Sequence, residues 1–247
     1  MIPVKTSVQL EKMRKAGKVT GDTLRYIEPF IKPGVTTLEL DELIEKFIIS
    51  QGARPNFKGL YGFPCSACIS VDDEVVHGIP SNRVLKEGEI VSIDVGAEVE
   101  GFNGDAARTF AVGKISEEKQ RLIDVTKQSF FEGLKQAKAG RRVGDISYAI
   151  QQYVEKHGYS VVKSMTGHGI GRAVHEDPSV PNFGKKGTGI RLKKGMCLAI
   201  EPMINAGTYQ VDFLSDGWSV LTRDRRPSAH YENTVAITEN GVEILTL

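Results

Sequence analysis

The chain has 247 residues, of which 40% are hydrophobic and 26% are charged, a composition typical of a globular protein. A net charge of +1 gives no support for a nucleic-acid partner, and no apolar run is long enough to predict a membrane span. The charged N-terminal stretch is unlike a secretory signal, so we expect a cytoplasmic protein.

Two amphipathic helices are expected, over residues 37–49 and 145–156, because apolar residues recur there at helical spacing between pairs of glycines. Between them, the polar segment 113–118 indicates a connection. Its Ser116 is expected to cap the N-terminus of a further helix.

The chain repeats one pattern. A lysine-and-glycine stretch at 86–88 precedes a predicted strand that reaches Asp94, and a similar stretch at 193–195 precedes a strand that reaches Glu201, 107 residues further on. If these carboxylates are related by symmetry, both should project from strand ends toward a common axis.

The repeat predicts one catalytic domain over residues 1–247, built of two pseudo-symmetric halves of about 1–112 and 113–247. Neither half is expected to bury its sheet alone, so the sheets should join with helices covering one side. The predicted fold class is therefore α+β, with pseudo-twofold symmetry and antiparallel sheets.

Three cysteines are too few for a disulfide framework. Cys65 and Cys68 form one C-x-x-C motif, but no second pair of ligands lies near enough in sequence to complete a zinc site. We interpret them as small apolar wall residues, and the role of the motif stays open.

Asp94 interrupts an apolar strand, and Asp105 follows 11 residues later, after a glycine-containing turn at 100–101. The spacing predicts a hairpin with both carboxylates on one face, as near-partners with β-carbons about 5 Å apart. Two carboxylates so close repel each other unless a cation lies between them. The alternative is turn capping and solvated edge charge, which the apolar neighbours of Asp94 disfavour.

The second half offers three more candidate ligands. His168 lies among glycines, and Glu201 and Glu232 each interrupt or open an apolar strand. Taken singly, His168 could be an ordinary loop residue and Glu232 an edge charge. Four carboxylates and one imidazole together favour two divalent cations such as Co²⁺, Mn²⁺, Fe²⁺ or Zn²⁺, without deciding among them.

At these residues the sequence resembles the methionine aminopeptidases of the bacterial type I class. The resemblance runs over essentially the whole chain and implies the pseudo-symmetric pita-bread fold. It rests on segments that together are highly specific, namely residues 77–80, 94–96, 103–110, 166–171, 175–176 and 201–203.

The resemblance also implies a role for each matching residue. One metal ion would be bound by Asp94, Asp105 and Glu232. The other would be bound by His168 and Glu201 together with Asp105 and Glu232, which are shared between the two ions.

His77 and His175 match substrate-contacting histidines, and the side chain of the first residue would be held by a pocket formed by Phe63, Cys68 and Trp218. Leu60 and Val174 stand where some relatives have aromatic residues, which leaves the preference for the second residue open.

The chemistry implied is hydrolysis of the first peptide bond by a hydroxide that bridges two metal ions. Glu201 would carry the proton to the departing amine, His175 would bind the scissile group as charge develops, and His77 would orient the backbone beyond it. The substrates would be peptides and nascent chains that begin with methionine. We expect a monomer with no membrane association, and contact with the ribosome is left open.

Two alternatives remain. An aminopeptidase P or prolidase-like Xaa-Pro peptidase would share the fold and the carboxylates but usually carries an extra N-terminal domain, whereas this chain begins almost directly with the first repeat. A non-catalytic scaffold of the same fold would be expected to lose ligands, yet all five candidates are present.

Overall fold

A computed structural model describes residues 2–247. Among the described residues there are four α-helices, and three of them begin at a residue whose side chain caps the first turn. The hydroxyls of Thr6, Thr36 and Ser116 each accept a hydrogen bond from the backbone N–H three residues on, which satisfies an otherwise unpaired donor of the first turn. The predicted cap at Ser116 is confirmed. The helices are α1 (Ser7–Ile27), α2 (Thr37–Ser50), α3 (Glu117–Leu134) and α4 (Val143–Lys156).

The strands form four antiparallel groups. The first sheet contains β1 (Arg54–Pro55), β2 (Ala67–Val71), β4 (Ile90–Val99) and β5 (Phe102–Ala111). The largest sheet contains β7 (Gly167–Gly169), β8 (Glu176–Val180), β9 (Cys197–Ile200), β14 (Asn233–Thr238) and β15 (Gly241–Ile244). Two three-stranded sheets consist of β6 (Ser160–Val161), β10 (Met203–Asn205) and β13 (Ser228–His230), and of β3 (Glu74–Val76), β11 (Val211–Phe213) and β12 (Val220–Thr222).

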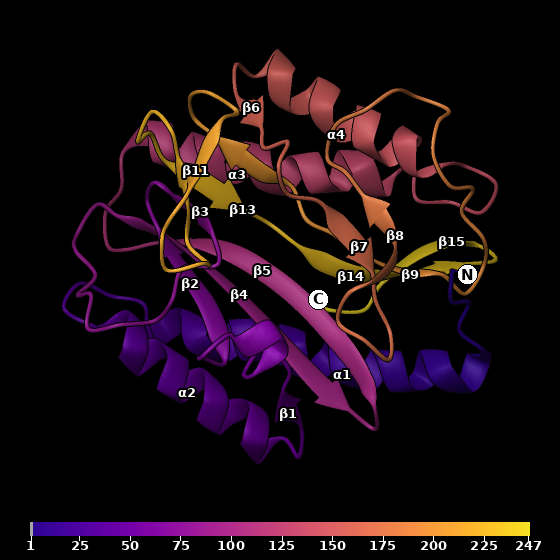
Figure 1. The fold of residues 1–247 in the computed structure, drawn as a ribbon, viewed down its shortest axis with the longest axis horizontal. Coiled ribbons are helices and arrows are strands. Elements are labelled where there is room, and N and C mark those ends of the chain that lie inside the picture. The colour runs from indigo at the N-terminus through magenta and orange to yellow at the C-terminus, as the bar shows by residue number, and fades with distance from the viewer. Residues whose placement is uncertain (1) are drawn as a thin grey trace.

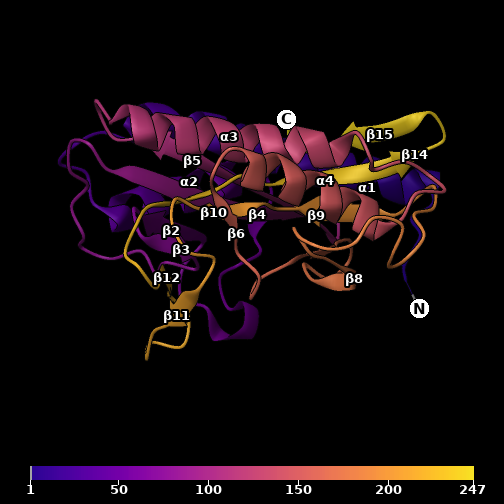
Figure 2. The ribbon, with the colours of Figure 1, turned by 90° about the horizontal axis from the view of Figure 1, so that it is seen from above.

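Each half has its own helix pair and its own core. Figure 1 shows α1 and α2 along one half and α3 and α4 along the other, and Figure 2 shows the helices together on one side of the sheets. Ile44 of α2 and Ile93 of β4 belong to the first core, and Ile150 of α4 and Leu198 of β9 belong to the second. The expected α+β architecture, with helices covering one side, is confirmed.

The two halves meet where residues 105–109 of β5 lie against residues 230–234, a contact that we call the central junction. Glu232 and Ala107 exchange backbone hydrogen bonds, at 2.9 and 3.4 Å. The hydroxyl of Thr234 accepts from the backbone N–H of Asp105 at 3.0 Å and donates to its carbonyl at 2.9 Å. The junction therefore holds Asp105 and Glu232, from opposite halves, in a fixed relation.

The hairpin of β4 and β5 corrects one expectation. Asp94 lies opposite Ala107 and Asp105 lies opposite Gly96, so the two acids are diagonal neighbours on one face and not direct partners. The turn at 100–101 is centred one residue later than the midpoint between the acids, which shifts the pairing by two residues. Diagonal neighbours on a sheet are about 7–8 Å apart, farther than the direct partners that the spacing predicts. Asp94 also lies in the middle of β4, which continues to Val99, and not at a strand end.

We propose that residues 1–247 form one catalytic domain whose halves divide within 113–118. This segment connects β5 to α3, and it lies between the elements that enclose the first core and those that enclose the second.

Helix α1 packs closely on the C-terminal segment of the chain. A β-carbon on Gly17 would lie 2.4 Å from the carbonyl oxygen of Leu245, and one on Gly21 would lie 2.7 Å from that of Thr246. Because both obstacles are backbone atoms, they cannot move aside as a flexible side chain would.

Gly17→Ala should therefore destabilise the protein, by about 1–3 kcal/mol from overpacking, although alanine is the better helix former. The free energy of unfolding in urea measures this, with the exposed neighbour substitution Lys18→Ala as control, expected within about 0.5 kcal/mol of the wild type. A Gly17→Ala protein as stable as the control would contradict the close packing.

Candidate active site

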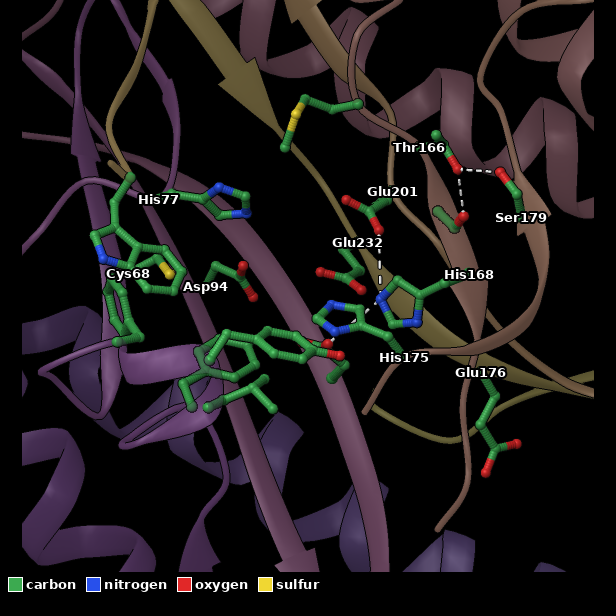
Figure 3. Close-up of a pocket in the computed structure, with 18 of the residues that line it drawn as sticks. Cys68, His77, Asp94, Thr166, His168, His175, Glu176, Ser179, Glu201 and Glu232 are labelled. Carbon is green, nitrogen blue, oxygen red and sulfur yellow. Dashed lines mark hydrogen bonds and ion pairs between the residues drawn. The ribbon is translucent and has the colours of Figure 1, made fainter. Parts of the chain in front are cut away.

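A cavity of about 740 Å³ opens between the halves beside the central junction. Figure 3 shows how side chains from both halves converge on it. All ten residues that the sequence marked as site candidates line this cavity: Phe63, Cys68, His77, Asp94, Asp105, His168, His175, Glu201, Trp218 and Glu232.

Four carboxylates form one end of the cavity. Asp94 and Asp105 project from β4 and β5, Glu201 directly follows β9, and Glu232 directly precedes β14. Asp105 is 3% exposed and Glu232 is 1% exposed. Strands from both halves thus bring four acidic groups together, of which Asp105 and Glu232 are buried and Asp94 and Glu201 are partly exposed to the cavity.

Burial of these like charges disfavours ionisation. It raises the pKa of Asp94 to about 7, and burial together with neighbouring carboxylates raises the pKa of Asp105, Glu201 and Glu232 well above the usual range. One oxygen each of Asp94, Asp105 and Glu232 has no hydrogen-bond partner within residues 2–247. Unpaired buried carboxylate oxygens are costly, and a divalent cation would satisfy them.

His168 turns one nitrogen toward the acids. Its Nδ1 lies 2.9 Å from the carbonyl of Gly169, which can only accept, so Nδ1 carries the proton and the lone pair of Nε2 points into the site. Nε2 lies 3.7 Å from Asp105 Oδ2 and 3.6 Å from Glu201 Oε1. Despite these acids, burial dominates and lowers the pKa of His168 to about 4, so the imidazole is neutral and able to bind a metal ion.

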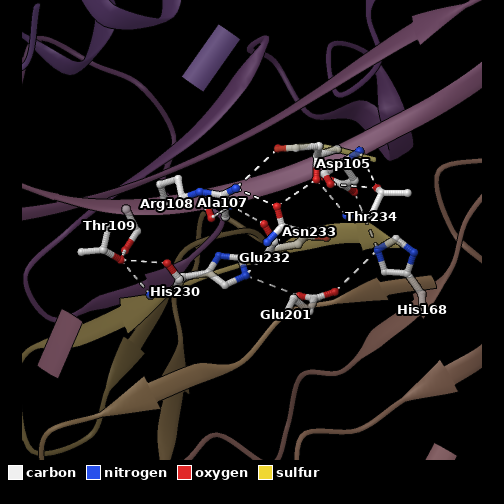
Figure 4. Close-up of polar contacts among 12 residues, drawn as sticks. Asp105, Ala107, Arg108, Thr109, His168, Glu201, His230, Glu232, Asn233 and Thr234 are labelled. Carbon is white, nitrogen blue, oxygen red and sulfur yellow. Dashed lines mark hydrogen bonds and ion pairs between the residues drawn. The ribbon is translucent and has the colours of Figure 1, made fainter. Parts of the chain in front are cut away.

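His230 is a site residue that the sequence reasoning missed. Figure 4 shows it on the side of Glu201 opposite His168. Its Nε2 lies 3.8 Å from Glu201 and 3.9 Å from Glu232, and it has no hydrogen-bond partner in the described part of the chain. The signal was available, because residues two apart in an extended segment share a face and His230 precedes Glu232 by two.

Two groups of side chains could each hold a metal ion, since the ligand atoms within each group lie within 4.8 Å of one another. They are Asp105, His168 and Glu232, and Glu201, His230 and Glu232. Asp94 belongs to neither group, although it lines the same cavity.

The other end of the cavity is apolar. Phe63 packs edge-on against Trp218, with ring centroids 5.0 Å apart, and Cys68 and Val174 complete the wall with Phe57. Burial raises the pKa of the Cys68 thiol well above its usual value, so it stays protonated as a wall residue. Phe57 was not singled out from the sequence, although it stands in an aromatic, glycine-rich stretch.

Two further histidines, His77 and His175, line the cavity. His175 stacks on Tyr61 with centroids 5.7 Å apart and meets His168 edge-on at 4.5 Å. Burial lowers the pKa of His175, and burial with the nearby His175 lowers the pKa of His77 to about 4. Both are therefore neutral hydrogen-bonding groups near neutral pH.

The chain is similar in sequence to known metallopeptidases. The model of metallopeptidase family M24 matches residues 11–239. The methionine aminopeptidase of Clostridium perfringens is 58% identical over 247 residues, covering 100% of this chain and 99% of the relative. Methionine aminopeptidase 1 of Bacillus subtilis is 51% identical over 246 residues, covering 100% of this chain and 99% of the relative.

Solved structures agree as well. The methionine aminopeptidase of Rickettsia prowazekii superposes with a TM-score of 0.99 at 46% identity, covering all of both chains. A prolidase from Pyrococcus furiosus superposes with a TM-score of 0.80 at 23% identity, covering 99% of this chain and 65% of the other, and so shares the fold.

The fold and the buried carboxylate cluster define a metal-dependent hydrolase. The chain belongs to metallopeptidase family M24, and the expected pita-bread fold is confirmed. A metallopeptidase needs a divalent metal ion, and the unpaired oxygens of this cavity fit that need.

The raised carboxyl pKa values predict how stability depends on pH and on metal. A carboxyl whose pKa is raised by folding, as that of Asp94 is from 3.8 to about 7, contributes stability that is present at low pH. That contribution is lost as the pH rises through about 7. The metal-free protein should therefore lose stability over this range, and a cation that binds the ionised form should restore it.

Added Mn²⁺ should raise the melting temperature more at about pH 7.5 than at about pH 5. At pH 7.5 and a Mn²⁺ concentration of a hundred times its Kd, the free energy of unfolding should rise by about 2.7 kcal/mol. Differential scanning calorimetry at both pH values measures this, and Asp105→Asn should abolish most of the effect. Equal shifts at the two pH values would contradict the link between ionisation and metal binding.

Proposed function

We propose that this chain removes the N-terminal methionine from peptides and nascent proteins by metal-dependent hydrolysis. The observation that carries the proposal is that one cavity is lined both by an acidic cluster suited to a metal centre and by an apolar cluster suited to an uncharged side chain. Relatives named methionine aminopeptidase, which match the whole chain, support this choice of substrate.

We propose two metal positions. One ion would be held by Asp94, Asp105 and Glu232. The other would be held by Asp105, Glu232, His168 and Glu201. Each ion can be Co²⁺, Mn²⁺, Fe²⁺ or Zn²⁺. The unpaired oxygens of Asp94, Asp105 and Glu232 support this sharing of ligands. When bound, such ions acidify water and polarise a peptide carbonyl.

The remaining steps fall to the side chains. Glu201 would accept the proton of the attacking water and deliver it to the departing amine, because its carboxylate lies in the cluster and also lines the open cavity. His175 would donate a hydrogen bond to the scissile group, and His77 would orient the next peptide unit.

The two ends of the cavity account for removal of a single residue. A free α-amine facing the acidic end would be attracted by Asp94 and its neighbours, whereas an internal peptide nitrogen carries no charge. The apolar wall of Phe63, Cys68 and Trp218 would hold the methionine side chain, and Leu60 and Val174 leave it wider than aromatic residues would.

For the setting of this activity, we propose a cytoplasmic monomer that acts on chains as they leave the ribosome. The bacterial origin of the relatives supports this proposal. None of the described helices has the length and apolar character that a bilayer-crossing segment needs.

The decisive assay compares three peptides. Met-Ala-Ser should be cleaved well, Lys-Ala-Ser at least about a hundredfold less efficiently because the apolar wall cannot solvate its charge, and a Xaa-Pro dipeptide hardly at all. Chromatography of the products after addition of each metal ion gives kcat/KM. Preference for the Xaa-Pro peptide would support the prolidase-like alternative, and no cleavage of any peptide would support a non-catalytic scaffold.

His175→Ala should lower kcat by roughly a hundredfold, because it removes a hydrogen bond made mainly in the transition state. Its Mn²⁺ affinity, measured by calorimetry, should stay within about threefold of the wild type, and Asp105→Asn, which removes a proposed ligand, serves as the contrasting variant. A collapse of metal affinity in His175→Ala would make His175 a ligand and the assignment wrong.

A further inference from the structure

Most of the apolar wall comes from a single segment, residues 57–68. Phe57, Leu60, Phe63 and Cys68 all belong to it and line the cavity. Only one short 3₁₀ turn, Leu60–Gly62, occurs before β2 begins. Backbone hydrogen bonds among Phe57, Gly59, Leu60, Gly62 and Phe63 close the first part of the segment into a tight turn. Residues 64–66, which lead to β2, belong to no helix or strand and depend on contacts with other elements.

The backbone within this segment takes unusual conformations. Gly59 and Gly62 have φ of 86° and 90°, and Tyr61 has φ of 51°, a region that residues with a β-carbon rarely occupy. Such conformations persist only when surrounding contacts enforce them.

Helix α2 contacts the two ends of residues 57–68 through two carboxylates. Asp41 is 5% exposed, and its Oδ1 accepts hydrogen bonds from the backbone N–H groups of Ser66 at 2.9 Å and Ala67 at 2.8 Å. One turn later, the two oxygens of Glu45 accept from Lys58 Nζ at 2.8 and 2.9 Å. Residues four apart share a helix face, so one face of α2 contacts both ends of residues 57–68, which we call the wall segment.

The two contacts differ in strength. The bonds to Asp41 are buried and made to backbone, directly before Cys68, and leaving two buried N–H groups without an acceptor would cost about 1–3 kcal/mol for each. The pair of Lys58 and Glu45 is half exposed, and such pairs contribute about 0–1 kcal/mol. Asp41 is therefore the main anchor and Glu45 the lesser one.

We propose that Asp41, assisted by Glu45, is a positioning residue for substrate selectivity, which holds the wall segment in the shape that fits a methionine side chain. This inference rests on the proposed function. It assigns Asp41 no contact with substrate or metal, so loss of the anchor should alter substrate fit more than chemistry.

The single tryptophan makes the wall directly observable. Trp218 lies in the wall against Phe63, so its fluorescence reports on this part of the cavity alone. Titration with L-methionine, followed by Trp218 emission, gives a binding constant that does not require turnover.

Three variants form the test. Asp41→Ala removes the acceptor, and Asp41→Asn keeps an amide oxygen in its place. Glu42→Gln, the matched control, changes an exposed pair with Lys46 on the same helix. Asp41→Ala should raise KM for Met-Ala-Ser and weaken methionine binding about tenfold, and should lower the preference for Met-Ala-Ser over Leu-Ala-Ser similarly. Its kcat and Mn²⁺ affinity should change less than threefold, and Asp41→Asn and the control should resemble the wild type.

Each outcome decides the proposal. A folded Asp41→Ala protein with unchanged KM and preference would overturn it, as would equal losses for Met-Ala-Ser and Leu-Ala-Ser, which indicate a general structural role. If Asp41→Ala does not fold, Lys58→Met should still raise KM about two- to threefold. An unchanged KM in Lys58→Met would overturn the proposal that α2 positions the wall. Should the wild type cleave no Met peptide, the proposed function fails, while the methionine titration still tests the anchor.

Discussion

The central junction between β5 and residues 230–234 is the contact on which the site depends. Paired backbone groups at Ala107 and Glu232 and the hydroxyl of Thr234 join two halves that each have their own core. Arg108 reinforces the contact, lying over the ring of Tyr231 with its guanidinium carbon 4.2 Å from the centroid and donating to Asn233 at 2.6 Å. Because Asp105 and Glu232 lie within these bonds, small relative motions of the halves cannot separate them.

This rigidity matters because the site by itself opposes folding. Four buried carboxylates repel one another, and their raised pKa values express that cost. The neutral imidazoles of His168 and His230 do not balance the charge. Stability must therefore come from the helix-covered cores and from close contacts such as that of Gly17 with Leu245. The acidic end is suited to binding cations, and it is held in place by surrounding contacts that do not involve a cation.

Much of this could be predicted from the sequence, and the failures have physical causes. Helix caps depend on local hydroxyl groups, so Ser116 was identified correctly. The diagonal relation of Asp94 and Asp105 was missed because the exact position of a turn decides strand pairing, and residue spacing alone does not give it. His230 and Phe57 were missed because their roles arise from tertiary proximity to Glu201 and to Trp218.

The carboxylate cluster and the apolar wall are thus held in place by different parts of the fold. The acids lie on strands fixed by the central junction, to which both halves contribute, so the geometry of the metal centre is set by the most constrained part of the fold. The wall that we propose to hold the methionine side chain is mostly residues 57–68 of the first half. It packs with Val174 and Trp218 of the second half and is hydrogen-bonded to α2. Under our proposal, changes in the segment or its anchor should alter which residue fits more than they alter the carboxylates. Residues 57–68 contribute no carboxylate to the cluster, and they meet it where Cys68 of β2 pairs with Asp94 of β4.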